Sequence, residues 1–294
     1  MPTLTPQDAA AIRELATTAA DADGVAPLSE ATLLALAGDD PHDTHWLTPR
    51  SRGGMAAYAH LRVEDDGSAW AELVVHPDER RAGLGEQFLG EVREAAPEVR
   101  CWAHGDLPPA RALAAKAGLQ PVRTLLVLSR RDVPAIEDPV APEGFSVRPF
   151  TEADADDWLA VNARAFAHHP EQGRLTRADL DQRIAQPWFD PAGLLLVRDD
   201  ATGALAASHW TKVADPGSGV GEVYVVAVDP AYQGRGLGRF VTRIGLAHLR
   251  DRGVREIELY VEGDNAPALA TYRREGFTER ERHVMYAAGS SLTP

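Results

Sequence analysis

A glycine-rich turn occurs twice in this chain of 294 residues and constrains its fold more than any other feature. The later copy reads Val226-Ala-Val-Asp-Pro-Ala-Tyr-Gln-Gly-Arg-Gly-Leu-Gly-Arg239, and the earlier copy reads Val74-Val-His-Pro-Asp-Glu-Arg-Arg-Ala-Gly-Leu-Gly85. Gly83 precedes Gly236 by 153 residues (236 − 83 = 153). Each copy reads as a buried strand, a turn and the start of a helix. The repetition predicts a tandem duplication, with two domains of ordinary size.

The duplication extends beyond the turn. Gly105 to Gly118 aligns with Gly263 to Gly276 at an offset of 158 (276 − 118 = 158). Each half therefore has the order strands, helix, strand, helix, strand, which predicts an α/β (α+β) fold with a mixed, partly open sheet. Residues 132–144 carry three prolines and little periodicity, so they are expected to link a first domain, 1–131, to a second, 145–294.

Composition excludes several classes of partner and compartment. The net charge of −14 argues against nucleic-acid binding, which needs a basic face. No apolar run approaches the ~20 residues that span a bilayer, and the first residues lack a secretion signal. The single cysteine, Cys101, fits a reducing cytoplasm and is expected to be a buried structural thiol. We expect a cytoplasmic monomer without nucleic-acid or membrane partners.

The later turn is suited to binding phosphate. Gln233, Gly236 and Gly238 form a Q-x-x-G-x-G pattern with few bulky side chains. Several backbone N–H groups can therefore point into one concavity at the positive end of a helix, which favours a pyrophosphate. The alternative is an ordinary strand-to-helix turn.

Two motifs together make the chain resemble the GCN5-related N-acetyltransferase (GNAT) superfamily over both halves. These are the turn after a V-x-V-D-P strand end and the N-x-x-A-x-x-x-Y pattern from Asn265 to Tyr272. The segments 162–173, 186–191 and 221–230 are similar to tandem-domain members that acetylate the cysteinyl amine of a glucosamine–inositol pseudodisaccharide. The resemblance implies two GNAT domains, acetyl-CoA as cosubstrate and no metal. Composition and spacing by themselves do not indicate that substrate.

The resemblance implies a general base at Glu222 and a general acid at Tyr272. Period-two alternation predicts that Glu222 shares a strand face with Val228. A carboxylate with an ordinary pKa of about 4.3 is a weak base, but a cysteinyl α-amine with a reference pKa of about 7.7–8.0 makes a modest demand. The alternatives are an exposed strand glutamate and a core tyrosine.

The resemblance also implies binding residues in both halves. For the acceptor these are Glu30, Glu171, Lys212, Glu222 and Tyr260. For CoA in the second half they are Val226, Ala227, Val228, Gln233, Gly234, Arg235, Gly236, Leu237, Gly238, Arg239, Asn265, Ala266, Pro267, Ala268, Leu269 and Ala270. For CoA in the first half they are Leu73, Val74, Val75, Arg81, Ala82, Gly83, Leu84, Gly85 and Glu86. Solvated surface roles remain open for Glu30, Glu171, Lys212 and Tyr260.

The first half lacks the residues assigned to catalysis. At the offsets above, Glu222 aligns with Ala69, Tyr272 with Ala114, Asn265 with Leu107 and Tyr260 with Trp102. Glu72 lies at odd separation from position 69 and is expected on the opposite face. We therefore expect the first half to bind acetyl-CoA without turning it over.

The sequence gives little support to a histidine metal site or to two alternative functions. His42 and His45 are expected in a polar loop rather than at a metal, and His168 and His169 diverge in any regular structure. One alternative function keeps the fold and acetylates a different amine, such as another amino sugar or a peptide N-terminus. Another is a non-catalytic CoA-sensing module, although it has no reason to retain Glu222 and Tyr272 beside the turn.

Overall fold

The computed structural model describes residues 4–51, 53–167 and 172–289. The chain divides into two compact units. Unit 1 comprises residues 1–126, 262–264 and 281–294, and unit 2 comprises residues 127–261 and 265–280. The domain limits expected from the sequence remain predictions. Residues 131–144 contain neither helix nor strand.

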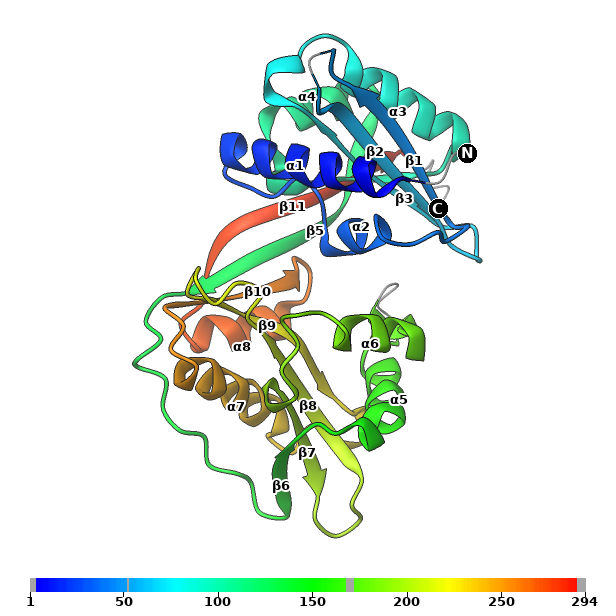
Figure 1. Cartoon of the computed structure of the whole chain (residues 1–294). Helices are drawn as coiled ribbons and strands as arrows, with labels where there is room; N and C mark the ends of the chain where they lie inside the picture. Colours follow the sequence, from blue (N-terminus) through cyan, green and yellow to red (C-terminus); the bar gives the residue numbers. More distant parts are fainter. Residues whose placement is uncertain (1–3, 52, 168–171, 290–294) are drawn as a thin grey trace. The chain divides into compact units, whose positions relative to one another are not determined.

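Unit 1 is built around a sheet in the order β1-β2-β3-β4-β11 (Figure 1). Its elements are α1 (Pro6–Asp23), α2 (Glu30–Ala35), β1 (Asp43–Pro49), β2 (Met55–Val63), β3 (Ala69–Val75), η1 (Pro77–Glu79), α3 (Leu84–Ala95), β4 (Arg100–Ala103), η2 (His104–Asp106) and α4 (Pro108–Lys116). Strands β5 (Leu119–Arg130) and β11 (Thr278–Ala288) contribute residues to both units. Within unit 1, Val284 of β11 pairs with Ala103 of β4.

Unit 2 repeats this architecture with the strand order β10-β9-β8-β7-β6. Its elements are β6 (Phe145–Pro149), η3 (Glu152–Asp154), α5 (Ala155–Ala165), η4 (Gln172–Arg174), α6 (Arg177–Ile184), η5 (Pro191–Gly193), β7 (Leu194–Asp199), β8 (Leu205–Lys212), β9 (Val220–Val228), η6 (Pro230–Tyr232), α7 (Leu237–Asp251), β10 (Glu256–Glu262) and α8 (Ala266–Arg274). Helices α4 and α8 begin at residues 108 and 266, which reproduces the 158-residue offset of the sequence repeat. The mixed α/β fold with two similar halves is confirmed.

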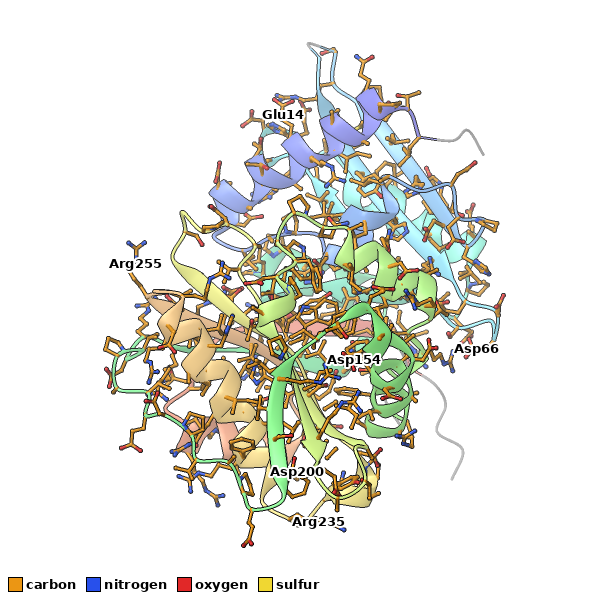
Figure 2. All side chains as sticks on the ribbon, turned by 60° about the horizontal axis from the view of Figure 1, so that its bottom comes forward. Glu14, Asp66, Asp154, Asp200, Arg235 and Arg255 are labelled. Atoms are coloured by element: carbon orange, nitrogen blue, oxygen red, sulfur yellow. The ribbon has the colours of Figure 1, made fainter. Side chains whose placement is uncertain are left out.

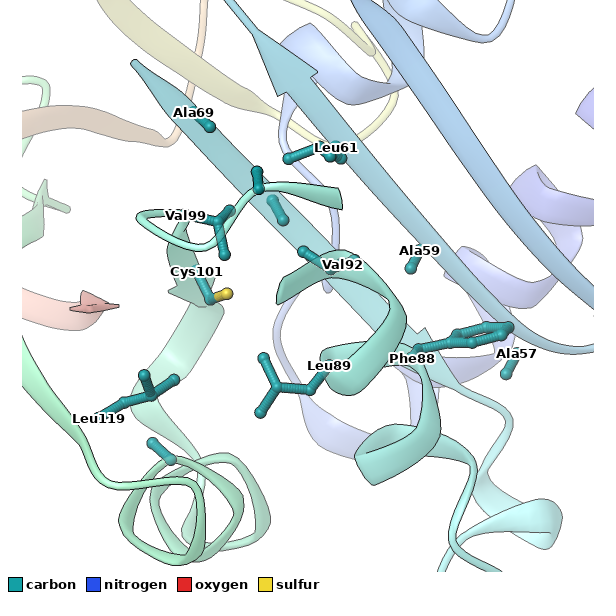
Figure 3. Packing of buried hydrophobic residues seen from close by; sticks show 13 residues of the cluster. Ala57, Ala59, Leu61, Ala69, Phe88, Leu89, Val92, Val99, Cys101 and Leu119 are labelled. Atoms are coloured by element: carbon teal, nitrogen blue, oxygen red, sulfur yellow. The ribbon is translucent and has the colours of Figure 1, made fainter. Parts of the chain in front are cut away.

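Alternation along the strands builds the two cores. In unit 1, α3 places Phe88, Leu89 and Val92 against small residues of the sheet, including Ala57 and Ala59 (Figure 3). Alanines there allow the helix to approach closely. In unit 2, Val225 and Ala227 of β9 pack beneath α5 and α6, whereas Val226 and Val228 pack beneath α7. Each sheet is therefore buried on both faces.

In each unit two parallel strands pair only at their beginnings and then diverge. Strands β9 and β10 pair from Val220 with Glu256 to Val223 with Leu259. Strands β3 and β4 pair at Trp70 with Arg100 and at Ala71 with Cys101. We call the β3–β4 divergence the first fork and the β9–β10 divergence the second fork. Each fork opens toward the glycine turn of its own half.

Candidate active site

A β-bulge shapes β9 where the base is expected. Trp210 of β8 lies opposite Val225, but the next residue, Thr211, lies opposite Val223. Tyr224 is therefore the extra residue of the bulged strand. A bulge inserts one residue and reverses the alternation of faces beyond it. Bulges are frequent beside active sites because they redirect a side chain.

The bulge corrects the expected orientation of Glu222. Glu222 lies opposite Lys212 of β8. Lys212 lies on the same face of the sheet as Trp210, which is the face covered by α5 and α6. Val228 packs on the α7 side. The prediction that Glu222 and Val228 share a face is therefore wrong, because strict period-two counting ignores the inserted Tyr224.

Glu222 and Lys212 form an ion pair on this face. Their Oε2 and Nζ atoms are 3.8 Å apart, and their side chains are only 18% and 10% exposed. The ammonium group also lies 4.8 Å from the ring centroid of Trp188 and 4.9 Å from that of Tyr224. Two aromatic rings and a carboxylate thus compensate for the low hydration of the cation. The structure brings together two of the residues expected at the acceptor site.

Strand β10 adds a tyrosine and a second carboxylate to the same face. Glu258 pairs in register with Glu222, and Tyr260 follows two residues later with 46% of its surface exposed. Paired residues of neighbouring strands project to the same side of a sheet. Sequence reasoning missed Glu258, whose carboxylate lies 2.6 Å from the guanidinium of Arg280. The sequence feature that could have indicated Glu258 is the alternation of Glu256, Glu258 and Tyr260 with apolar residues along β10.

Tyr272 lies in the last turn of α8, two residues before its end. Its ring meets Phe277 edge to face, with the centroids 5.8 Å apart. Burial raises the pKa of Tyr272 to about 12. The phenol therefore keeps its proton near neutral pH, as a proton donor must.

The later glycine turn has the backbone expected of an anion cradle. Gly234 and Gly236 both adopt a left-handed conformation, with φ of 78° each. Helix α7 follows directly, and no side chain caps its first turn. Its first N–H groups thus retain their capacity to bind an anion. Arg235 stacks on Tyr232 at 4.9 Å and lies at the outer edge of unit 2 in Figure 2.

The other residues expected at CoA in the second half lie on β9, α7 and α8. Arg239 lies 3.5 Å from Glu275 and is largely exposed. Asn265 caps α8 by accepting a hydrogen bond from the amide of Ala268. Leu237, the first residue of α7, has a buried side chain, so it can offer a ligand only its backbone. Val226 to Val228 continue β9 past the last pair with β10.

The first half has a matching turn and a large cavity. Arg81 and Gly83 adopt φ of 66° and 89°, which reproduces Gly234 and Gly236 of the second half. A cavity of about 860 Å³ lies between this turn and the first fork. Its walls include Leu73 to Val75, Arg81, Gly83 to Glu86, Trp102 and His104. A non-glycine residue in the left-handed region costs about 1–2 kcal/mol. The first half therefore keeps this turn geometry even though the backbone at Arg81 is strained.

The strand pairing also corrects which residue of the first half is equivalent to Glu222. Strands β2 and β3 pair without a shift from Ala57–Val75 to Val63–Ala69. The first half therefore lacks the bulge. The pair Glu222–Glu258 corresponds to Trp70–Arg100, so Trp70 rather than Ala69 occupies the place of Glu222. The expected carboxylate is absent in either alignment.

The remaining expected residues are in unit 1 or are not among the residues that the structure describes. Glu30 begins α2 in unit 1, and Glu171, His168 and His169 lie outside the described residues. His42 hydrogen-bonds Asp40 and Asp65, and His45 contacts the hydroxyl of Tyr58. Within the described ranges, no cluster of side chains suits a metal ion, and no helix is long and apolar enough to span a bilayer.

Cys101 is buried, and burial raises the pKa of its thiol to about 12. A protonated, largely buried thiol is a poor nucleophile. The expectation of a buried structural cysteine is confirmed.

Comparison with known proteins decides the family. The model of the "Acetyltransferase (GNAT) family" matches residues 10–119 and 154–277, one match in each half. The chain belongs to the acetyltransferase (GNAT) family. It is accordingly an N-acetyltransferase, and its acetyl donor is acetyl-CoA.

Full-length relatives and solved structures agree with this GNAT assignment. The chain is 49% identical to mycothiol acetyltransferase of Catenulispora acidiphila, with 95% of each chain covered. It is 50% identical to the enzyme of the same name from Thermomonospora curvata, with 96% of this chain and 94% of the relative covered. A tandem GNAT protein of the clavulanic acid pathway shares the fold, with a TM-score of 0.74, 23% identity and coverage of 96% and 95%.

Proposed function

We propose that this GNAT enzyme acetylates the cysteinyl α-amine of a glucosamine–inositol pseudodisaccharide and so completes mycothiol. The observation that carries this proposal is the 45–50% identity to relatives named mycothiol acetyltransferase over both halves. An acceptor with many hydroxyl groups and one amine suits a polar face that presents Lys212, Glu222 and Tyr260. We further propose that the enzyme is a cytoplasmic monomer that uses no metal.

In the proposed reaction, the amine nitrogen attacks the thioester carbonyl of acetyl-CoA. Glu222 accepts the amine proton, directly or through a water molecule. Backbone N–H groups of β9 beyond the second fork stabilise the oxyanion, a contribution that can reach ~10²–10³ in rate. The tetrahedral intermediate then releases the CoA thiolate, which takes a proton from Tyr272. The products are the amide and the CoA thiol.

The roles of the remaining residues follow from their chemistry. Lys212 would hold Glu222 in place and donate hydrogen bonds to acceptor hydroxyls. Glu30, Glu171 and Tyr260 would bind hydroxyl groups or the charged amine. The turn from Gln233 to Arg239 would bind the CoA pyrophosphate, with α8 from Asn265 to Ala270 beside it. These assignments rest on the family motif and on the positions described above.

We also propose that the first half binds a second acetyl-CoA without turnover. The cavity of about 860 Å³ beside the matching turn supports binding. Trp70 in place of the base and Ala114 in place of the acid support the lack of turnover.

The test offers acetyl-CoA with a panel of amines and follows the release of CoA thiol. The panel includes the cysteinyl pseudodisaccharide, another amino sugar and a peptide N-terminus. We expect the first to react fastest and Glu222→Gln to lower kcat by about 10²-fold or more. Glu14→Gln, an exposed carboxylate on α1 (Figure 2), should retain full activity.

Three outcomes would contradict the proposal. Preference for a different amine would leave an acetyltransferase with another acceptor. Absence of turnover with every amine, despite acetyl-CoA binding, would favour a CoA-sensing module. Full activity of Glu222→Gln would remove the proposed base.

A further inference from the structure

A buried carboxylate stands at the opening of the first fork. Glu72 directly follows Ala71, the last residue of β3 paired with β4, and its side chain is 1% exposed. Its Oε2 atom accepts a hydrogen bond of 2.8 Å from the amide of Ser29. Burial opposes ionisation, but His104, Ser29 and Thr32 outweigh it and hold the pKa of Glu72 below its usual value. The catalytic scheme makes no use of this group.

His104 completes a bridge across the fork. It directly follows β4, and its Nε2 atom lies 2.9 Å from Oε1 of Glu72. Because a carboxylate only accepts, Nε2 is the donor. The imidazole is held from two sides, stacked with Trp102 at 6.1 Å and edge-on to His283 at 4.9 Å. His104 forms part of the cavity wall, and Glu72 lies behind it.

The bridge lies on the side from which an acceptor would approach. In the second half, Glu222 projects to the α5–α6 face. Its equivalent, Trp70, lies two positions before Glu72, so both project to one face of β3. The hydrogen bond to Ser29, the residue that caps α2, fixes that face as the α2 side. In the second half the residue that register places at Glu72 is Val225, which cannot form such a bridge.

We propose that the Glu72–His104 bridge closes the acceptor side of the first fork, so that acetyl-CoA bound in the first cavity is shielded from amines. This inference rests on the proposed binding of acetyl-CoA in the first half. The first half lacks the base and the acid, so it cannot catalyse the transfer. The bridge has a different effect, because it keeps amines from reaching the thioester. A nucleophile that reaches the thioester carbon forms a bond to it and displaces the CoA thiolate, which then takes the nucleophile's proton. The bridge prevents the first of these contacts.

The test uses hydroxylamine, a small nucleophile that converts the thioester to a hydroxamate and free CoA thiol. The background is Glu222→Gln with Tyr272→Phe, in full-length protein held in excess over acetyl-CoA. In that background, Glu72→Val with His104→Ala replaces the bridge by apolar groups and reproduces the valine of the second half. Replacing both partners of a buried hydrogen bond by apolar groups is often tolerated. His104→Ser is a second opening variant, and it carries the test if the double variant does not fold.

We expect the opening variants to release CoA thiol about tenfold faster than the background protein, since water and small nucleophiles are otherwise excluded. His104→Gln, which can still donate to Glu72 and fills the wall, should stay protected. Calorimetry first counts the acetyl-CoA molecules bound per chain. Two bound ligands with unchanged release in the opening variants would overturn the closure. One bound ligand, unaffected by Gly83→Ala, would instead overturn binding in the first half.

Discussion

Tyr272 shows how burial keeps a single side chain protonated while making its phenol a weaker acid. Since burial raises the pKa of its hydroxyl to about 12, the proton is present throughout an ordinary assay range. A thiolate with a conjugate pKa of about 8.5 needs a donor mainly when it departs. The residue therefore acts late in the proposed reaction.

Tyr272→Phe should lower kcat by about 10²-fold and leave the KM for acetyl-CoA nearly unchanged. Steady-state release of CoA thiol measures both constants. Tyr58→Phe in unit 1 removes another buried hydroxyl whose pKa burial raises, and its kcat should equal that of the unmodified enzyme. A Tyr272→Phe enzyme with an unchanged kcat would exclude the phenol as the acid.

The sequence proposed candidate site residues but not the contacts among them. The motif pointed to Glu222, Lys212 and Tyr260, and register places all three on one face. The ion pair between Lys212 and Glu222 could not be foreseen, because it depends on which residues of β8 and β9 lie opposite one another. Glu258 was missed although it alternates with Tyr260 along β10, because only the pairing of β10 with β9 places it beside Glu222.

At the scale of elements, the two glycine turns allow a matched comparison. An added Cβ would meet nothing within 4 Å at Gly83 or Gly236, so a substitution there strains only the left-handed backbone. That strain is about 1–2 kcal/mol, or roughly 5–30-fold in an equilibrium.

Gly236→Ala should raise the KM for acetyl-CoA by roughly 5–30-fold, because the cradle must distort. Gly83→Ala should leave kcat/KM intact and weaken only the second binding event seen by calorimetry. Gly67→Ala, with φ of 79° in a hairpin, controls for general destabilisation. Equal effects of Gly83→Ala and Gly236→Ala on kcat/KM would contradict the division of labour between the halves.

Elements were more predictable than their irregularities. The glycine turn predicted a strand before it and a helix after it, and β9 and α7 occupy these places. The bulge at Tyr224 left no local signal, because an inserted residue resembles any other strand residue. Nor does local pattern fix which strand β11 joins, since pairing depends on tertiary packing.

At the scale of the whole molecule, buried neutral histidines govern stability toward acid. Burial lowers the pKa of His209 to about 4, from an ordinary 6.5. Its Nδ1 lies 2.8 Å from the carbonyl oxygen of Val241. Burial also lowers the pKa of His45, in unit 1, to about 4. Below pH 6.5 the unfolded chain takes up protons that these folded sites resist, so acid favours unfolding.

The contribution of these two histidines to the free energy of unfolding should be constant above pH 6.5 and should fall as the pH drops toward 4. For His209 alone the loss approaches about 3 kcal/mol. Denaturant titrations at pH 7.5 and 5 measure it. His209→Gln, whose amide can still donate to the carbonyl of Val241, should weaken this dependence. Equal stability of the native protein at both pH values would refute the assignment.

The bulge in β9 has a consequence for anyone who wishes to give the first half an activity of its own. Grafting a glutamate at Ala69, where a plain alignment places it, would bury the new charge among the side chains beneath α3. The glutamate should replace Trp70, the next residue, because β3 has no bulge and its side chains alternate between the two faces without interruption. Pairing geometry, not residue counting, determines where the graft would point.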